Sequence, residues 1–281
     1  MPAGDMMPIA IKSFICYIFL MGIILGIYAF LEPFLLAEKY IDLQSPDLPE
    51  QFRDTRIVFL TDIHYGPFFS RARLRRLVNR VNGLQPDIVL LGGDYVHRSP
   101  NYIKPCFAEL KNLEAPLGVY GVLGNHDHWE GAALTRQCMA GAGIRLIDNE
   151  AYWLEKNGGR IKVGGVGDYL EDILDIEPTI ADVNKNDFVV LVTHNPDYAE
   201  EMGTDKVDLV LAGHNHGGQV TFFGLWAPIL PSEYGQKYRT GIVEVVGAKV
   251  IVSNGVGNIT PPVRFFARPQ IIIVDLQKAG Q

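Results

Sequence analysis

Residues of the kinds that bind metal ions follow several short apolar runs along this chain. In chain order they are Asp62 and His64 after RIVFL, Asp94 after DIVLL, Asn125, His126 and Asp127 after a run ending at Leu123, His194 after FVVLVT, and His214 and His216 after VDLVLA. Five of the seven histidines take such positions, and a random scatter would rarely produce that arrangement. The pattern indicates a site built from distant parts of the chain.

The side-chain types narrow the chemistry to one class of metal ion. Imidazole, carboxylate and amide groups without a thiolate favour manganese, iron, zinc or nickel, with manganese the foremost candidate. A site for magnesium or calcium alone would use fewer histidines. The candidate ligands are too many for one tetrahedral ion but suffice for two divalent ions that share a carboxylate. They are Asp62, His64, Asp94, Asn125, His194, His214 and His216.

The elements that must position these side chains alternate in type through the first half of the chain. Apolar runs at 56–60, 87–91 and 118–123 predict buried strands, and the intervening segments 70–82, 101–113 and 131–142 predict helices. This order implies parallel strands joined by right-handed crossovers. In open α/β sheets ligands gather at the carboxyl ends of strands, so we expect the candidate ligands to converge.

The second half of the chain is richer in strands. Two segments, about 170–183 and 196–203, predict helices, and short apolar runs predict strands at 144–148, 151–154, 161–165, 188–193, 207–212, 218–223, 241–246, 249–253 and 270–275. A second sheet packed on the first, with helices outside, is therefore expected. The predicted fold class is α/β, with two packed mixed β-sheets flanked by helices.

The N-terminal segment predicts a single-pass membrane anchor. Residues 13–31 carry no charge, and a helix of that length rises roughly 28 Å, close to the hydrocarbon thickness of a bilayer. A cleaved signal peptide is the alternative, although the run is long for one and no A-x-A-like site directly follows it. Lys12 and Lys39 flank the segment at similar distances, so the side of the membrane stays open. We expect an anchor over 1–32, a linker over 33–54 and a catalytic domain over 55–278.

Charge and cysteine content limit the partners. The formal net charge is -7, whereas a general nucleic-acid binder needs a basic face, so no nucleic acid is expected as a partner. A small phosphorylated or lipid-linked substrate is compatible with this charge, because bound cations would supply positive charge locally. The three cysteines are widely spaced and imply no disulfide framework.

Taken together, the motifs resemble those of the calcineurin-like metallophosphoesterase superfamily. The resemblance rests on D-x-H, G-D, G-N-H-D, a lone H and G-H-x-H in that order, and it covers residues 62–219. The sequences DIHYG, HNPD and GHNHGGQ are similar to those of a bacterial membrane-associated phosphodiesterase branch, which is itself similar to one type of UDP-2,3-diacylglucosamine pyrophosphatase. Asn215 stands where the family more often has threonine, at a position that is not a ligand. The resemblance implies an αββα sandwich.

The resemblance also implies a role for each residue. One ion would be held by Asp62, His64 and His216. The second would be held by Asn125, His194 and His214, and both ions would share Asp94. His126 would act on the leaving oxygen or the transition-state phosphoryl group, and Asp127 would orient its ring.

Several further residues are weaker candidates. Tyr65 and Asn195 flank ligands and are candidates to line the pocket, and Arg264 is a candidate contact for a substrate phosphate. His97 is interpreted as an exposed loop residue. His128 is interpreted as a solvated turn residue, with a side chain that reaches the site as the alternative. An apolar cluster is expected in the core, with a lip for a lipid-like substrate as the alternative; its members are Phe222, Phe223, Leu225, Trp226 and Ile229.

The predicted function is a two-metal-dependent phosphoesterase that hydrolyses a phosphodiester or pyrophosphate at the membrane surface. UDP-2,3-diacylglucosamine pyrophosphatase activity in lipid A synthesis is an alternative. A third hypothesis, from a different functional class, is that the protein is a metal-bearing scaffold that binds partners without catalysis. Such a scaffold should lack a ligand or the catalytic histidine, and this chain has the complete set.

Overall fold

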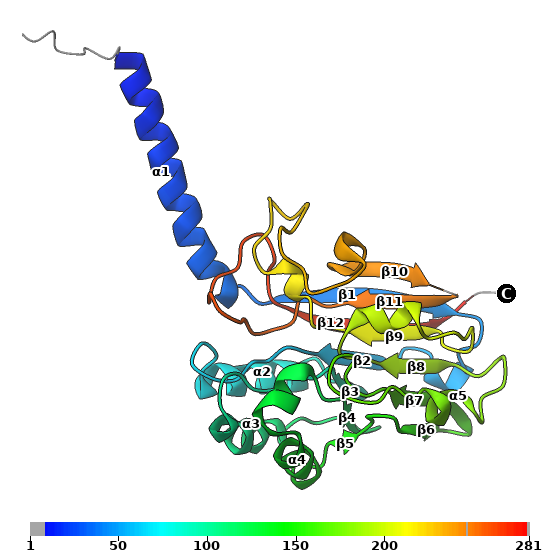
Figure 1. The fold of residues 1–281 in the computed structure, drawn as a ribbon. Helices are drawn as coiled ribbons and strands as arrows, with labels where there is room; N and C mark the ends of the chain where they lie inside the picture. Colours follow the sequence, from blue (N-terminus) through cyan, green and yellow to red (C-terminus); the bar gives the residue numbers. More distant parts are fainter. Residues whose placement is uncertain (1–8, 246, 280–281) are drawn as a thin grey trace, which may run out of the picture.

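Two six-stranded mixed sheets pack face to face in the computed structural model, which describes residues 9–245 and 247–279 (Figure 1). The first sheet has the order β1 (Ala37–Ser45), β12 (Gln270–Lys278), β2 (Arg56–Leu60), β3 (Ile88–Leu91), β4 (Val119–Gly121) and β5 (Arg145–Leu146). The second has the order β10 (Gly241–Val245), β11 (Ala248–Val252), β9 (Leu209–Ala212), β8 (Val189–Val192), β7 (Gly159–Gly165) and β6 (Ala151–Lys156). The predicted fold class is confirmed.

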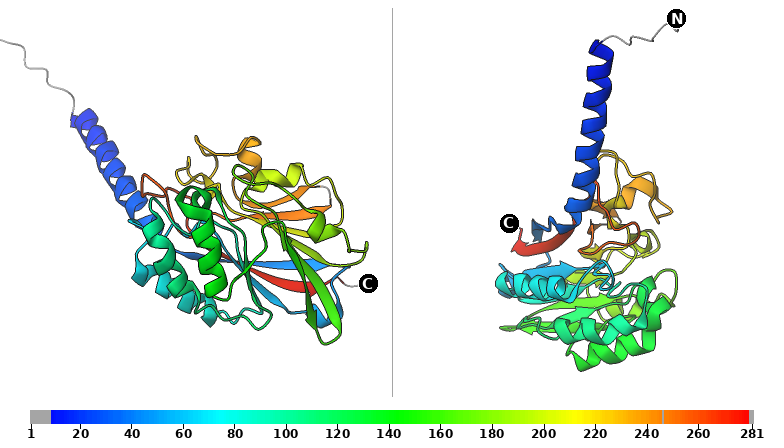
Figure 2. Two further views of the ribbon diagram at one scale, coloured as in Figure 1. Left: turned by 60° about the horizontal axis from the view of Figure 1, so that its bottom comes forward. Right: turned by 90° about the vertical axis from the view of Figure 1, so that its left-hand side faces the viewer.

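Three helices cover the outer face of the first sheet (Figure 2): α2 (Arg71–Gly83), α3 (Ile103–Leu110) and α4 (Asn125–Gly141). In α2 the leucine and valine side chains are buried while Arg75 and Arg80 lie outside, as the helical periodicity predicts. Helix α5 (Glu177–Ile180) is a single turn beside β7. The described residues also form short 3₁₀ turns at Glu32–Phe34, Glu50–Phe52, Pro100–Tyr102, Pro196–Glu200, His216–Gly218 and Gly235–Tyr238.

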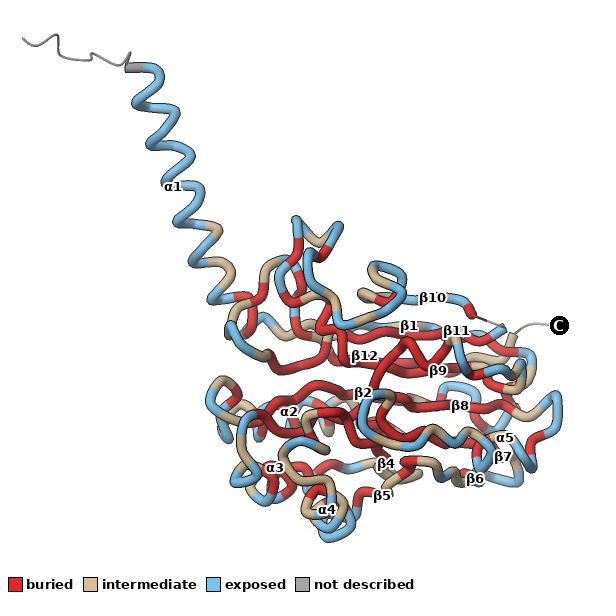
Figure 3. The backbone as a smooth tube through the Cα atoms, in the orientation of Figure 1, coloured by how far each residue is buried: buried red, intermediate tan, exposed pale blue. Residues whose placement is uncertain are grey.

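The strands that precede the candidate ligands are buried on both faces. β2, β3 and β4 pair in parallel, which confirms the predicted β-α-β-α-β order. Ile57 and Phe59 of β2 pack in the layer between the sheets, whereas Val58 and Leu60 pack under the helices. Figure 3 shows this burial as continuous red along the inner strands. Because both faces of these strands are covered, nearly every residue in them must be apolar. The candidate ligands follow in the chain where each apolar run ends.

The predicted linker over 33–54 is wrong for its central part, because β1 lies there and pairs in parallel with β12. β1 is an edge strand, so only one side of its backbone is paired and only some of its side chains are buried. Leu43 and Ser45 point inward while Asp42 and Gln44 are exposed. Exposed polar side chains alternate with buried ones along β1, and prolines flank the strand, so its sequence resembles that of a linker.

Three other segments also differ from the prediction. Residues 218–223 form isolated bridges rather than a strand, because Gly218, Gln219 and Phe223 take positive φ values that turn the backbone. The segment 170–183 contains only the four-residue α5, and 196–203 contains a 3₁₀ turn rather than an α-helix.

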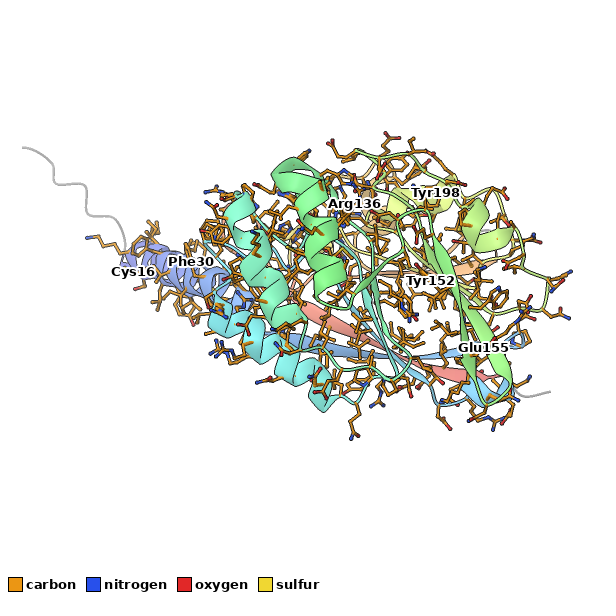
Figure 4. The ribbon with its side chains drawn as sticks, turned by 90° about the horizontal axis from the view of Figure 1, so that it is seen from below. Cys16, Phe30, Arg136, Tyr152, Glu155 and Tyr198 are labelled. Carbon is orange, nitrogen blue, oxygen red and sulfur yellow. The ribbon has the colours of Figure 1, made fainter. Side chains whose placement is uncertain are left out.

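Helix α1 (Ile9–Leu31) leaves the two sheets and projects away from them (Figures 1 and 2). Residues Ala10–Phe34 are long and apolar enough to cross a membrane, with a mean hydropathy of 2.5. Side chains such as Cys16 and Phe30 are exposed (Figure 4). Among the described residues, it is the one helix with this length and composition.

Candidate metal centre

The carboxyl ends of strands from both sheets meet at one place, and the seven candidate ligands lie there. The first sheet supplies Asp62 and His64 after β2, Asp94 after β3 and Asn125 after β4. The second sheet supplies His194 after β8, and His214 and His216 after β9. All seven side chains are buried.

One group of ligands consists of Asp62, His64 and His216, whose ligand atoms all lie within 4.8 Å of one another. The Nε2 atoms of His64 and His216 are 3.0 Å apart, and His216 Nε2 is 3.5 Å from Asp62 Oδ1. Two imidazole lone pairs at this distance repel unless a proton or a cation lies between them. The geometry therefore suits a cation held by these three residues.

Asp94 connects this group to a second one. Its Oδ2 lies 3.4 Å from Nε2 of His64 and 3.4 Å from Nε2 of His194. Its Oδ1 accepts a 2.9 Å hydrogen bond from the backbone N–H of His126, which fixes the carboxylate in place. One carboxylate oxygen facing two imidazole nitrogens from different sheets is the arrangement that a bridging ligand needs.

The second group contains His194, His214 and Asn125. The Nδ1–H of His194 donates to the carbonyl of Gly92 at 2.7 Å, which leaves Nε2 as the free lone pair. That Nε2 is 3.2 Å from Nδ1 of His214. Nδ1 of His214 is therefore the nitrogen that faces the ligand atom of His194. Within the described part of the chain, Asn125 Oδ1 and Asn215 Oδ1 are among the buried side-chain oxygens without a hydrogen-bond partner, and only the first belongs to a candidate ligand. Buried polar atoms normally have partners, so Asn125 Oδ1 fits a ligand role.

The backbone at the ligands is unusual. Five of the seven have left-handed φ values: Asp62 (54°), His64 (45°), Asp94 (55°), His214 (65°) and His216 (51°). Such conformations cost free energy in non-glycine residues and cluster at functional sites. Their common occurrence at one cluster indicates that the sheet ends aim these side chains at a shared point.

Burial and mutual proximity shift the protonation of the cluster. Burial lowers the pKa of His64 and of His216 well below the usual value, so both rings are neutral and can donate a lone pair. Burial raises the pKa of Asp62 to about 7. Burial also lowers the pKa of His194, but the adjacent Asp94 carboxylate outweighs it and raises that pKa well above its usual value. The carboxylates thus attract a positive charge, which is a proton when no cation is bound.

A cavity of about 480 Å³ opens over the ligands. His126 lines it at the start of α4, with its ring 4.8 Å from that of His64 and 4.7 Å from that of Trp129. Asn195 also lines this cavity, as predicted, although its Oδ1 accepts from the backbone of Asp197. A phosphate group in the cavity would therefore meet both ligand groups and the His126 ring.

Two side chains outside the ligand set lie elsewhere than predicted. Arg264 is fully buried and donates to the carbonyls of Asn254, Ala267 and His216 at 2.7 to 3.3 Å, so it supports the His216 loop and does not reach a substrate. Tyr65 packs in the core under the helices, with its ring 5.7 Å from that of Tyr102. Both predictions of a substrate contact are therefore wrong for this structure.

His97 is buried, not exposed, and was not predicted for the site. Its ring centroid is 5.4 Å from that of His64 and 5.1 Å from that of His126. One ring nitrogen from each of the three residues lies within 4.8 Å of the other two. No periodicity marks His97, and only its place three residues after Asp94 could have suggested it. His128 was also expected in a solvated turn, but it lies in α4 with its side chain 12% exposed, and its Nε2 is 3.8 Å from Asp172.

Asp127 does not contact the His126 ring, as was predicted, but three backbone N–H groups. Its carboxylate accepts from the backbone N–H groups of Asp94 at 2.7 Å, Tyr95 at 3.0 Å and Gly124 at 3.0 Å. Within the described residues, His126 Nδ1 is buried without a hydrogen-bond partner, so Asp127 does not hold that ring. Asp127 instead joins the ends of β3 and β4 and thereby positions Asp94.

The family model for "Calcineurin-like phosphoesterase" matches residues 55–218. The chain is 29% identical over 261 residues to "Uncharacterized metallophosphoesterase YkuE" of Bacillus subtilis, covering 91% of this chain and 90% of that one. It is 30% identical over 269 residues to "Uncharacterized metallophosphoesterase" of Aquifex aeolicus, covering 92% and 98%. A "Transmembrane protein with metallophosphoesterase domain" of Danio rerio is 28% identical, covering 86% of this chain and 58% of that protein.

Proposed function

This chain belongs to the calcineurin-like phosphoesterase family, and on that premise we propose that it is a two-metal hydrolase of a phosphodiester or a pyrophosphate. The observation that carries the proposal is Asp94 Oδ2, which lies 3.4 Å from imidazoles of both ligand groups. Asp62, His64 and His216 would hold one divalent ion, Asn125, His194 and His214 a second, and Asp94 both. Nitrogen and oxygen ligands without a thiolate suit manganese first, and iron, zinc or nickel as alternatives.

When bound, such ions would lower the pKa of a water molecule and neutralise phosphate charge. The protein's own residues do the remaining work. The cavity would hold the phosphorus so that the bond to the water oxygen forms opposite the bond that breaks. His126 lines the cavity and would give a proton to the leaving oxygen. One water would then convert a phosphodiester into an alcohol and a phosphate monoester, or a pyrophosphate into two separate phosphate groups.

The same proposal extends to the membrane. α1 has the length and composition of a membrane span, and a relative from Danio rerio carries "Transmembrane" in its name. We therefore propose that α1 is a single-pass anchor and that the substrate is met at the membrane surface. UDP-2,3-diacylglucosamine is one candidate substrate of this kind.

A substrate panel tests the proposed function. Full-length protein in detergent, freed of metal and reloaded with Mn²⁺, should hydrolyse bis-p-nitrophenyl phosphate, and a chelator should abolish the rate until Mn²⁺ is restored. Phosphorus-detected reactions with UDP-2,3-diacylglucosamine and with simple phosphodiesters then rank the substrates. Protein that binds two ions yet hydrolyses none of these compounds would be the metal-bearing scaffold, and the hydrolase proposal would be wrong.

A further inference from the structure

Residues 222–229, which we call the apolar loop, hold large hydrophobic side chains out of the core. Phe222 is 63% exposed, Leu225 77%, Trp226 52% and Ile229 80%. The expectation that this cluster packs in the core is therefore wrong. Soluble surfaces seldom gather this many large apolar side chains in one short segment, and such patches mark contacts with a partner or a membrane.

The apolar loop is braced by its backbone rather than by burial of its side chains. The Thr221 hydroxyl accepts from the N–H of Gly224 at 2.8 Å and donates to the carbonyl of Phe265 at 2.8 Å. Phe222 N–H donates to the carbonyl of Trp226 at 2.6 Å, and Arg239 donates to the carbonyl of Gly224 at 2.8 Å. The fold thus fixes the apolar tip in place instead of letting it collapse inward.

Aromatic rings join the apolar loop to the base of α1. Phe223 lies 5.1 Å from Phe266, and Phe266 lies 5.2 Å from Tyr28 of α1, measured between ring centroids. The backbone N–H of Arg264 donates to the carbonyl of Ala29 at 3.0 Å. Figures 1 and 2 show the loop on the side from which α1 projects. The exposed apolar surface of α1 therefore continues onto the loop.

The other end of the apolar loop reaches the metal centre. A cavity of about 180 Å³ is lined by Ile229 and Pro228 of the loop, by Ile259, and by His214 and His216 of the ligand set. Arg264, whose backbone contacts α1, donates from its guanidinium to the carbonyl of His216 at 3.3 Å. The apolar loop and the segment that contacts α1 therefore both adjoin the candidate metal ligands.

We propose that the apolar loop inserts into the bilayer that α1 spans, so that the site takes a phosphate ester or anhydride embedded in that membrane. The occupant is a lipid bilayer, because the patch continues the surface of α1 and carries Trp226, a residue type enriched at membrane interfaces. The substrate class is then an amphiphile with an acyl or alkyl chain, whose phosphate reaches the ligands along Ile229. This inference rests on the proposed hydrolase function for its substrate, but not for its insertion.

Lipid quenching of tryptophan tests insertion directly. Full-length protein in nanodiscs of phosphatidylcholine brominated on its acyl chains should show quenching relative to unbrominated discs. That quenched component should disappear in Trp226→Phe, which leaves Trp129 and Trp153 in place. Equal quenching in both proteins would overturn insertion and would leave the loop as a surface for a protein partner.

A pair of esters tests the substrate class. Hexadecyl p-nitrophenyl phosphate embedded in vesicles and ethyl p-nitrophenyl phosphate in solution share one reaction centre and differ only in chain length. In reconstituted protein, Phe222→Ser/Leu225→Ser should lower turnover of the hexadecyl ester at least about tenfold and leave that of the ethyl ester unchanged, because only the first needs the inserted loop. Ile173→Ser, which alters an equally exposed residue outside the loop, should change neither.

The outcomes separate the two proposals. If the wild-type protein hydrolyses both esters and the loop variant matches it on both, the membrane-embedded substrate class is wrong while the hydrolase stands. If the metal-loaded wild-type protein hydrolyses neither ester nor the substrate panel, the hydrolase is wrong, and the Trp226 quenching alone decides insertion.

Discussion

Single residues at the candidate metal centre are held in costly backbone conformations, which points to a shared function. Asp62, His64, Asp94, His214 and His216 all have left-handed backbone, and each such residue costs on the order of 1–3 kcal/mol. The surrounding structure must compensate this cost. Asp127 contributes through three backbone hydrogen bonds at the ends of β3 and β4, and Arg264 contributes through the carbonyls around His216.

The first prediction concerns His126, which lines the cavity but is not a proposed ligand. His126→Ala should keep both ions and lower turnover of bis-p-nitrophenyl phosphate by about 10²–10⁴-fold, the usual loss on removing a general acid. Metal content and turnover are measured together. His128→Ala is the matched control, because this neighbour on α4 faces Asp172 instead of the cavity. Unchanged turnover in His126→Ala would remove that residue from the mechanism.

The sequence could predict the ligand types and their places after strands, since apolar runs mark buried strands and polar residues mark their ends. It could not predict His97 or Arg264. His97 is buried only because the segment after β3 folds back against His64 and His126. Arg264 is buried because it donates to the carbonyls of Asn254 and Ala267 and to that of His216, which is distant in the sequence. Such contacts depend on tertiary geometry that no local pattern carries.

At the scale of elements, the ends of β4 and β5 are joined by a buried carboxylate. Asp148, just after β5, accepts from the N–H of Leu123 at 2.9 Å, and Arg136 of α4 lies 3.4 Å from it and 3.0 Å from Asp172 (Figure 4 labels Arg136). Burial raises the pKa of Asp148 to about 7, against the partial opposition of the Leu123 hydrogen bond and of Arg136. The folded state therefore favours the protonated acid.

The second prediction follows from this shift. The pKa of Asp148 is higher in the folded chain than in the unfolded one, so its contribution to stability is present below about pH 4 and is lost as pH rises to about 7. Over that window the free energy of unfolding of the wild type should fall relative to Asp148→Asn by up to about 1.4 kcal/mol per pH unit. Denaturant unfolding at pH 5 and pH 8 measures it, and identical pH slopes would contradict it.

Strands that are buried on both faces could be predicted from the sequence, whereas strands at the edge of a sheet were harder to predict. β2, β3, β8 and β9 are apolar throughout because both faces are covered, and the sequence marks them clearly. β1 is an edge strand whose polar side chains resemble a linker. The apolar residues of 218–223 suggest a strand, but positive φ values at Gly218 and Gln219 turn the chain toward the apolar loop instead.

At the scale of the whole molecule, the candidate metal centre lies where strand ends from the two sheets meet. The first sheet supplies Asp62, His64, Asp94 and Asn125, and the second supplies the remaining three histidines. The segment that contacts α1 through Arg264 also supports His216. Bound ions would therefore hold together parts of the chain that are separate in the sequence. Asp94, whose Oδ2 faces imidazoles of both ligand groups, would be the ligand that the two ions share.

The metal content of Asp94→Ala tests this central claim most directly. Full-length wild-type protein reloaded with Mn²⁺ should hold two ions per chain by elemental analysis, and Asp182→Ala, which alters a surface carboxylate away from the ligands, should hold the same. Asp94→Ala should retain less than one ion and lose its turnover, because both sites lose their shared ligand. Two tightly bound ions in Asp94→Ala would contradict the account.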